Sequence, residues 1–105
     1  MKIYLRKNKV WKLFNNPTPN DFNVRNITIG EGAYIGENAK IDDNVFIGYN
    51  AFIGKGTLIG EGAFIGEGAK IGYGAYIGKG AYICDGASIG DNAIIDNYAV
   101  IHKNE

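Results

Sequence analysis

The sequence predicts an all-β solenoid in which short parallel strands stack in successive coils. The first observation is a period of six: isoleucine recurs at every sixth position from Ile29 to Ile101 without a slip. The second is a small or β-branched residue four positions after each isoleucine, from Ala33 to Ala99. The third is the confinement of all 16 glycines to residues 30–90. A fixed short period of this kind indicates a repeat architecture.

Each position of the unit Ile-Gly-x-Gly-Ala-x has a physical meaning. Because side chains alternate across a strand, Ala63 and Ile65 point inward when Phe64 points outward. The Gly-x-Gly segment then forms a corner. Its last position is Gly or Asn in every unit except the one that carries Tyr98, and those two residue types best tolerate a positive φ. We therefore expect a left-handed residue at each corner and a strained or altered corner at Tyr98.

The same pattern excludes two other repetitive structures. A period of six does not match the 3.6-residue turn of a helix, and each glycine would cost a helix roughly 1 kcal/mol. A collagen triple helix needs glycine at every third position and abundant proline, whereas this chain has 2 prolines. Stacked coils of short parallel strands remain.

Residues 29–101 resemble the hexapeptide-repeat proteins, because the six-residue unit continues through all of them. The resemblance implies a single-stranded, left-handed parallel β-helix in which three units close a triangular coil of eighteen residues. The twelve complete units would give about four coils. The resemblance also implies a homotrimer with parallel axes, since most characterised relatives assemble in this way.

Residues 1–26 carry no repeat and are expected to form an N-terminal cap and connector, with residues 27–105 forming the β-helix. Residues 3–5 and 10–13 predict a hairpin, and residues 17–19 predict an extended connector. Solenoids need such protection at their ends. Residues 1–26 are also basic, and the alternative to a cap is that this segment contacts a neighbouring subunit or an acidic partner. The side chains expected to cover the first coil are Trp11, Leu13, Phe14 and Phe22.

Stacking at intervals of eighteen residues sorts the outward side chains onto three faces, of which two are strongly apolar. Contiguous exposed apolar surface usually marks an interaction site, so we expect these faces to be buried between copies of the chain. The alternative is that stacked aromatic rings only stabilise neighbouring coils. The candidate interface residues are Phe46, Phe64, Tyr82 and Val100 on one face and Leu58, Tyr76 and Ile94 on the other.

The family resemblance also implies acyltransferases that use acetyl- or acyl-coenzyme A and a histidine as general base, often beside a loop that interrupts the coils. The one histidine here is His102, no insertion interrupts the repeat, and neither Ser nor Cys lies near His102 in the sequence. His102 is therefore a weak candidate for a catalytic base at a subunit interface, and a solvated terminal residue is the alternative. Cys84 replaces a corner glycine and is expected to be a partly exposed thiol without a nucleophilic role.

Other chemistries are disfavoured. The zinc-binding branch of the family resembles γ-class carbonic anhydrase and needs three histidines, so we expect no metal site unless three copies of His102 met on a threefold axis. The net charge of zero disfavours nucleic-acid binding. Lys and Arg interrupt the N-terminal segment, which predicts no signal peptide or membrane span. A single cysteine fits a reducing compartment, so we expect a cytoplasmic protein.

Two functions of different classes remain open. The first is a homo-oligomeric binding or scaffold module with no evident catalytic centre and no evident cofactor. The second is a minimal acyltransferase that builds its site between subunits and uses acetyl-CoA or another acyl-CoA. A third alternative is a fragment of a larger hexapeptide-repeat enzyme. The unbroken repeat favours the first, and the family resemblance favours the second.

Overall fold

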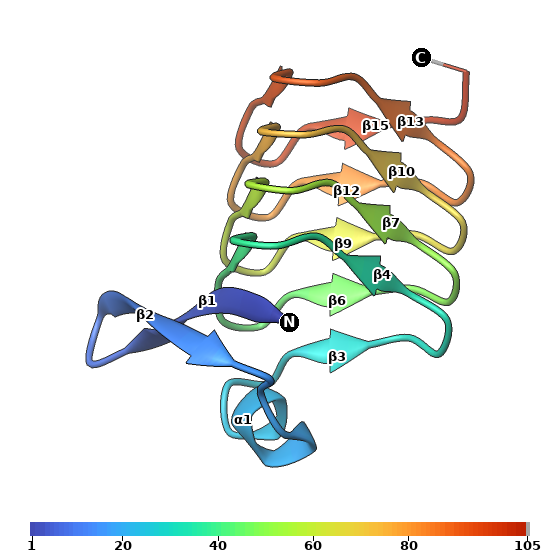
Figure 1. The fold of residues 1–105 in the computed structure, drawn as a ribbon. Helices are drawn as coiled ribbons and strands as arrows, with labels where there is room; N and C mark the ends of the chain where they lie inside the picture. The colour runs from blue at the N-terminus through green and yellow to red at the C-terminus, as the bar shows by residue number, and fades with distance from the viewer. Residues whose placement is uncertain (105) are drawn as a thin grey trace.

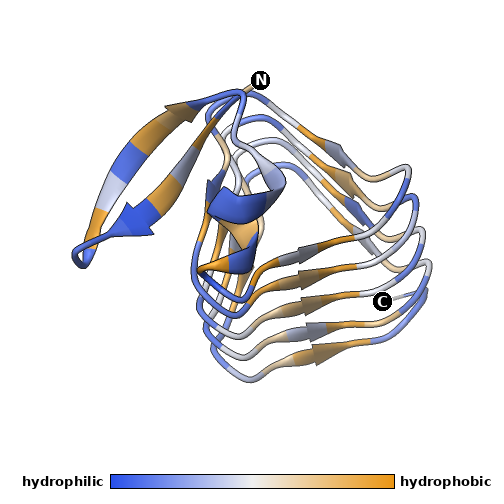
Figure 2. Cartoon of the chain, turned by 90° about the horizontal axis from the view of Figure 1, so that it is seen from below, coloured by the Kyte–Doolittle hydropathy of each residue, from blue (hydrophilic) through white to orange (hydrophobic). Residues whose placement is uncertain are grey.

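A computed structural model describes residues 1–104 and confirms the predicted β-solenoid of stacked parallel strands (Figure 1). Its strands form three sheets, one along each side of a triangular coil (Figure 2). Sheet B contains β3 (Thr28–Ile29), β6 (Phe46–Ile47), β9 (Phe64–Ile65), β12 (Tyr82–Ile83) and β15 (Val100–Ile101). Sheet C contains β4 (Tyr34–Ile35), β7 (Phe52–Ile53), β10 (Lys70–Ile71) and β13 (Ser88–Ile89). Sheet A contains β5 (Lys40–Ile41), β8 (Leu58–Ile59), β11 (Tyr76–Ile77) and β14 (Ile94–Ile95), together with the N-terminal strands β1 (Lys2–Lys7) and β2 (Val10–Asn15).

The coils wind in the left-handed sense. In Figure 1 the chain climbs along the rear sheet B from left to right, turns forward, and returns along the front sheet C from right to left. The usual right-handed rule depends on long twisted strands joined by packed crossovers. Here each strand of the coil is two residues long and each connection is a tight corner, so that packing argument does not apply.

Backbone hydrogen bonds between coils hold the predicted register of eighteen residues. Phe46 pairs with Phe64 and Ile47 with Ile65 across β6 and β9. The amide of Phe46 donates to the carbonyl of Ala63 at 3.0 Å, and the amide of Gly48 donates to that of Ile65 at 2.8 Å. Because each rung satisfies its neighbour's backbone groups, the polar main chain can line an apolar interior.

The interior is a column of isoleucines alternating with small residues, as the unit predicts. Ile41, Ile59 and Ile77 lie one above another along sheet A and are each 0% exposed. Thr57 takes an alanine position and is also fully buried. Its hydroxyl donates to the carbonyl of Gly72 at 2.9 Å, which removes the cost of burying a polar group there.

The corners have the left-handed conformation that the sequence predicts. All thirteen last corner positions have a positive φ, including Tyr98 with φ 63°. The corner at Tyr98 therefore keeps the regular geometry with an unfavourable residue, rather than changing shape. The first corner position has a different constraint: a Cβ added to Gly54 would lie 2.6 Å from the backbone carbon of Gly72 in the next coil. Glycine is required there because the coils approach closely.

The N-terminal hairpin is built into the solenoid. Strands β1 and β2 pair antiparallel, as predicted, and β1 also pairs in parallel with β5. The amide of Tyr4 donates to the carbonyl of Ala39 at 2.8 Å, and Ile3 and Leu5 are 0% exposed. Thus β1 occupies the place in sheet A that a strand of a preceding coil would take.

The segment after the hairpin is extended at Thr18, as predicted, but the expected connector is shorter than 17–19 because Pro19 already begins a helix. A short helix, α1 (Pro19–Asn23), begins there with a capping box between Thr18 and Asp21. Phe14 and Phe22 pack against the core, whereas Leu13 is 44% exposed, so the expected cover by Leu13 is wrong. Trp11 is half-buried beneath the Arg6 guanidinium instead of covering the coil.

Among residues 1–104, no helix has the length and apolar character that crossing a bilayer requires.

The strained corner at Tyr98 gives a first prediction. The Tyr98 side chain is 67% exposed, and its ring lies against the Cα side of Gly80. Tyr98→Asn should raise the free energy of unfolding by about 0.5–1 kcal/mol, because Asn adopts the left-handed region at lower cost. Chemical denaturation measures the change. Asn92→Tyr, at the same corner position with φ 60°, is the matched control and should lose a similar amount. A destabilised Tyr98→Asn variant would mean that ring packing outweighs backbone strain.

Candidate functional site

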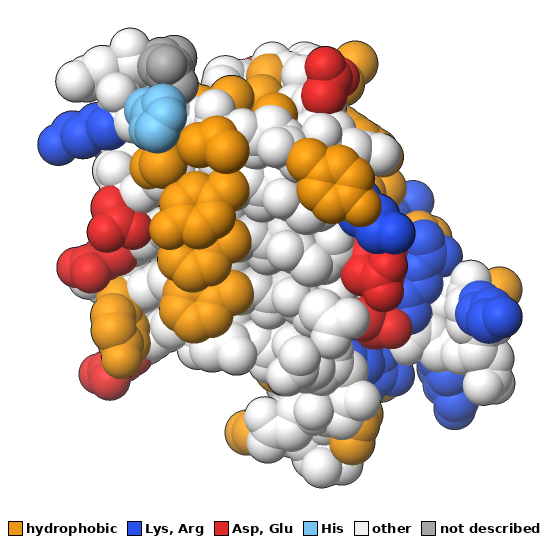
Figure 3. All heavy atoms as spheres, turned by 180° about the vertical axis from the view of Figure 1, so that it is seen from behind, with side chains coloured by type: hydrophobic (Ala, Val, Ile, Leu, Met, Phe, Trp, Pro, Cys, Tyr) orange, Lys and Arg blue, Asp and Glu red, His pale blue; other side chains and the backbone are white. Residues whose placement is uncertain are grey.

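A ladder of stacked aromatic rings forms an exposed apolar surface on sheet B. Phe46 stacks on Phe64 with ring centroids 4.8 Å apart, and Phe64 stacks on Tyr82 at 4.4 Å. Val100 continues the same column, because it pairs with Tyr82 across β12 and β15. Tyr82 is 44% exposed and Val100 is 51% exposed. Figure 3 shows this column on the surface opposite the view of Figure 1. The sequence-predicted residues of this face therefore form one continuous, accessible strip.

The second predicted face, on sheet A, is less uniform. Leu58 is half-buried, whereas Tyr76 and Ile94 are 43% and 75% exposed. Lys40 begins the column, and its ammonium lies 5.6 Å from the centre of the Tyr4 ring on β1. The apolar part of this face is therefore limited to the later coils.

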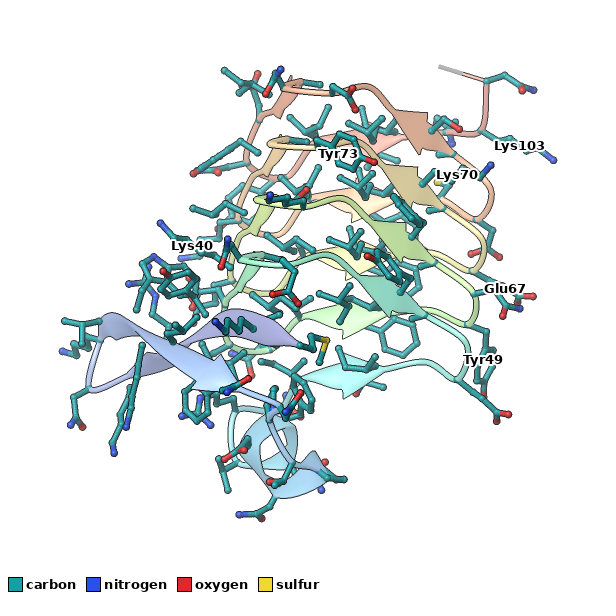
Figure 4. All side chains as sticks on the ribbon, in the orientation of Figure 1. Lys40, Tyr49, Glu67, Lys70, Tyr73 and Lys103 are labelled. Atoms are coloured by element: carbon teal, nitrogen blue, oxygen red, sulfur yellow. The ribbon has the colours of Figure 1, made fainter. Side chains whose placement is uncertain are left out.

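Sheet C carries one aromatic pair followed by polar residues. Tyr34 stacks on Phe52 at 5.0 Å, and Lys70 and Ser88 continue the column. Lys70 extends outward from sheet C in Figure 4. This face is therefore the least apolar of the three along its length.

Cys84 and His102 lie together, which the sequence analysis missed. Cys84 Sγ and His102 Nδ1 are 3.5 Å apart, although the residues are eighteen positions apart in the chain. The near sequence neighbours of His102 include no Ser or Cys. The eighteen-residue stacking places the two residues in consecutive coils, so this signal was present in the sequence. The expectation of a partly exposed thiol is confirmed, since Cys84 is half-buried.

The Cys84–His102 pair lies where sheet B turns into the corner toward sheet C. That corner displays a column of outward residues, of which Tyr49, Glu67 and Lys103 are labelled along one edge of Figure 4. The carboxylate of Asp85 belongs to the same column and accepts a hydrogen bond from the amide of Glu67 at 2.9 Å. The pair is therefore flanked by the aromatic ladder on one side and by charged corner residues on the other.

A charged hollow of about 590 Å³ lies between the hairpin and the corner that follows sheet A. Its basic wall is partly engaged within the chain. Arg6 Nε lies 3.4 Å from Asp42 Oδ1 and Oδ2, and Arg25 Nε donates to the carbonyl of Arg6 at 2.7 Å. The Arg6 guanidinium also lies 4.0 Å from the centre of the Trp11 ring. The hollow therefore contains both signs of charge, and its arginines also hold the hairpin against the coils. Its lining residues are Arg6, Lys7, Asn8, Lys9, Val24, Arg25, Asp42, Asp43 and Glu61.

Asp43 is the perturbed group of this hollow. Its Oδ1 is shielded from solvent and has no hydrogen-bond partner within residues 1–104. Burial raises the pKa of Asp43 above its usual value, and the nearby carboxylates of Asp42 and Glu61 raise the pKa further. The Arg25 guanidinium opposes this shift. The folded environment thus disfavours ionisation of Asp43 relative to the unfolded chain.

Comparison with known proteins supports the repeat. A family model described as bacterial transferase hexapeptide (six repeats) matches residues 38–73 and 68–103, which together exceed half of the chain. The chain belongs to the hexapeptide-repeat family. No curated protein sequence matches this hexapeptide-repeat chain significantly.

Among solved structures, this hexapeptide-repeat chain is similar to serine acetyltransferase isoform 3 from Entamoeba histolytica, crystallised in complex with cysteine. The two share 27% sequence identity and a TM-score of 0.54. The match covers 82% of this chain and 38% of the acetyltransferase chain. The hexapeptide-repeat chain thus spans well under half the length of that enzyme.

The raised pKa of Asp43 predicts a pH-dependent stability. Because the folded protein holds this proton more tightly than the unfolded chain, stability falls as pH rises from the usual value near 3.8 through the raised pKa. Asp43→Asn should remove that loss and stabilise the protein at neutral pH by about 0.5 kcal/mol, a small value because the group is partly exposed. Denaturation at pH 3 and pH 7 measures the effect. Asp85→Asn, whose Oδ1 can still accept from Glu67, should give no such gain. Equal stability of wild type and Asp43→Asn at pH 7 would contradict the prediction.

Proposed function

We propose that the chain is the subunit of a homo-oligomer, a homotrimer like its characterised relatives, that acts as a binding or scaffold module. The observation that carries this proposal is the exposed ladder Phe46, Phe64, Tyr82 and Val100 on sheet B. Relatives of this kind are typically oligomeric, which supports a second copy as the occupant of the ladder.

The ladder has the properties of an interface rather than of coil-to-coil stacking alone. Parallel rings 4.4–4.8 Å apart stabilise neighbouring coils. That stacking leaves the outer edges of the rings and the side chain of Val100 in water, with Tyr82 still 44% exposed. Burial of each large apolar side chain would contribute about 1.5–3 kcal/mol. Tyr76 and Ile94 on sheet A extend the apolar surface available to a neighbouring copy.

Replacing the centre of the ladder tests the oligomer. Phe64→Lys/Tyr82→Lys should give folded monomers at micromolar concentration, because two ammonium groups would be desolvated in the interface. Multi-angle light scattering measures the mass, and circular dichroism checks that the fold is retained. Tyr34→Lys/Phe52→Lys is the matched control, because it breaks a similar ring stack on sheet C and should leave the oligomer intact. A monomeric wild-type protein would contradict the proposal.

A second candidate is an acyltransferase with its site between subunits. It is supported by the transferase family model and by the similarity to an acetyltransferase. It is also supported by the place of His102, which is exposed at the edge of sheet B where a neighbouring copy would complete a cleft. The acyl-CoA would supply an activated thioester. The hydroxyl or amine would attack the thioester carbonyl while His102, as general base, accepts its proton; the carbon–sulfur bond would then break, and coenzyme A would leave as the thiol with that proton.

Calorimetry with acetyl-CoA tests the transferase candidate on the full chain. Binding that saturates, together with acetyl transfer to a small alcohol or amine, would support it. His102→Ala should then lower the transfer rate by about 10²–10⁴-fold, the usual contribution of a general base, without abolishing acetyl-CoA binding. Cys84→Ser is the matched control and should keep the activity. Absence of acetyl-CoA binding would remove this candidate, and full activity in His102→Ala would remove the role of that residue.

A further inference from the structure

Cys84 and His102 occupy a repeat position that is otherwise almost reserved for glycine. The residue directly after the repeat isoleucine is glycine in nine of thirteen units, and the four exceptions are Asp42, Cys84, Asp96 and His102. Two of these exceptions, Cys84 and His102, fall in consecutive coils of one column. They are also the one cysteine and the one histidine of the chain. The two residues best suited to bind a soft metal ion thus stand together at a place where the fold disfavours side chains.

The backbone fixes these two side chains relative to each other. Ile83 pairs with Ile101 across β12 and β15, directly before the two residues. The amide of Cys84 donates to the carbonyl of Ile101 at 2.9 Å, and the amide of Tyr82 donates to that of Ala99 at 2.8 Å. Regular coil stacking therefore fixes the backbone positions from which the thiol and the imidazole extend, which is the kind of rigid support a ligand pair needs.

The distance between the two donor atoms fits a shared metal ion. In a tetrahedral zinc site the bonds are about 2.3 Å to sulfur and about 2.0 Å to nitrogen, which places the two ligand atoms about 3.5 Å apart. Cys84 Sγ and His102 Nδ1 are 3.5 Å apart. An ion can thus bind both atoms without movement of the coils.

Residues 1–104 of one chain supply no third ligand beside the pair. No group of three or more His, Cys, Asp or Glu side chains that could hold a metal occurs within residues 1–104. The nearest carboxylate in the sequence, that of Asp85, accepts from the amide of Glu67 and is directed toward the coil below. Cys84 is half-buried and His102 is exposed, so a second molecule can approach the pair.

We propose that Cys84 and His102 form half of a zinc site, and that the same pair from a second copy of this chain completes it. The Cys84 thiolate and His102 Nδ1 are the ligands of each copy, and together they make the closed Cys₂His₂ set typical of structural zinc. Thiolate and imidazole ligands in tetrahedral geometry select zinc over magnesium or calcium. The ligands of this contact are not ladder residues, because they lie at the corner directly after β12 and β15.

Cobalt titration of the reduced full chain tests the site. Co²⁺ should produce a thiolate-to-metal charge-transfer band and the intense visible bands of a tetrahedral complex, saturating at about one ion per two chains, and Zn²⁺ should displace it. Light scattering should show that metal doubles the mass of the protein and that a chelator reverses the change. Cys84→Ser should abolish the charge-transfer band, and His102→Ala should weaken Co²⁺ binding at least tenfold.

Two further results separate this proposal from the proposed function. In Phe64→Lys/Tyr82→Lys, the metal-dependent doubling should persist even where the ladder interface is lost. Saturation at one ion per chain without a change in mass would overturn the shared site. Absence of the charge-transfer band in folded wild-type protein would overturn metal binding altogether, and leave the pair as a thiol–imidazole hydrogen bond.

Discussion

The stacking of each coil on the next, in a register of eighteen residues, is the constraint on which the rest of this molecule depends. It places isoleucine over isoleucine in a dry interior, with Ile59 and Ile77 fully buried, and it pairs the backbone of each inner strand of the coils with both neighbours. The same closeness leaves no space for a Cβ at Gly54. It also requires a left-handed residue at every corner, and even Tyr98 accepts that conformation. One repeated geometry thus dictates the core, the corners and the outward columns.

The N-terminal segment shows how the chain begins this stacking without a repeat of its own. Strand β1 supplies the missing rung of sheet A through its pairing with β5, and Ile3 and Leu5 continue the buried apolar interior. The hairpin is then held by arginine contacts, including Arg6 with Asp42. Gathering charges of both signs in one hollow has a local cost, because Asp43 is left with a buried oxygen that accepts no hydrogen bond from the described residues 1–104. The cap and the charged hollow therefore both result from the packing of the N-terminal hairpin against the first coils.

The candidate functional features lie in one region, because the regular coils place residues eighteen positions apart in the sequence next to one another on the surface. The aromatic ladder runs along sheet B, and the Cys84–His102 pair lies at the corner where that sheet ends. A neighbouring copy packed on the ladder would bring its own surface close to His102. Scaffolding and acyl transfer would therefore use adjacent parts of the molecule. The family model and the similar acetyltransferase support the β-helix architecture. The outward side chains of this chain would determine which partner or ligand each face binds.

The sequence by itself determined the solenoid, its corners and its three faces, because each depends on a local unit repeated without interruption. Ile29 to Ile101 encode the period, and Gly or Asn encodes the corner. The docking of β1 on β5 and the start of α1 at Pro19 lay outside that pattern, since residues 1–26 carry no repeat. The eighteen-residue register was enough to predict that Cys84 and His102 are neighbours. Only the tertiary structure gave the 3.5 Å separation of their donor atoms. A period specifies which residues are neighbours, whereas rotamers and contacts between coils specify how close their side chains come.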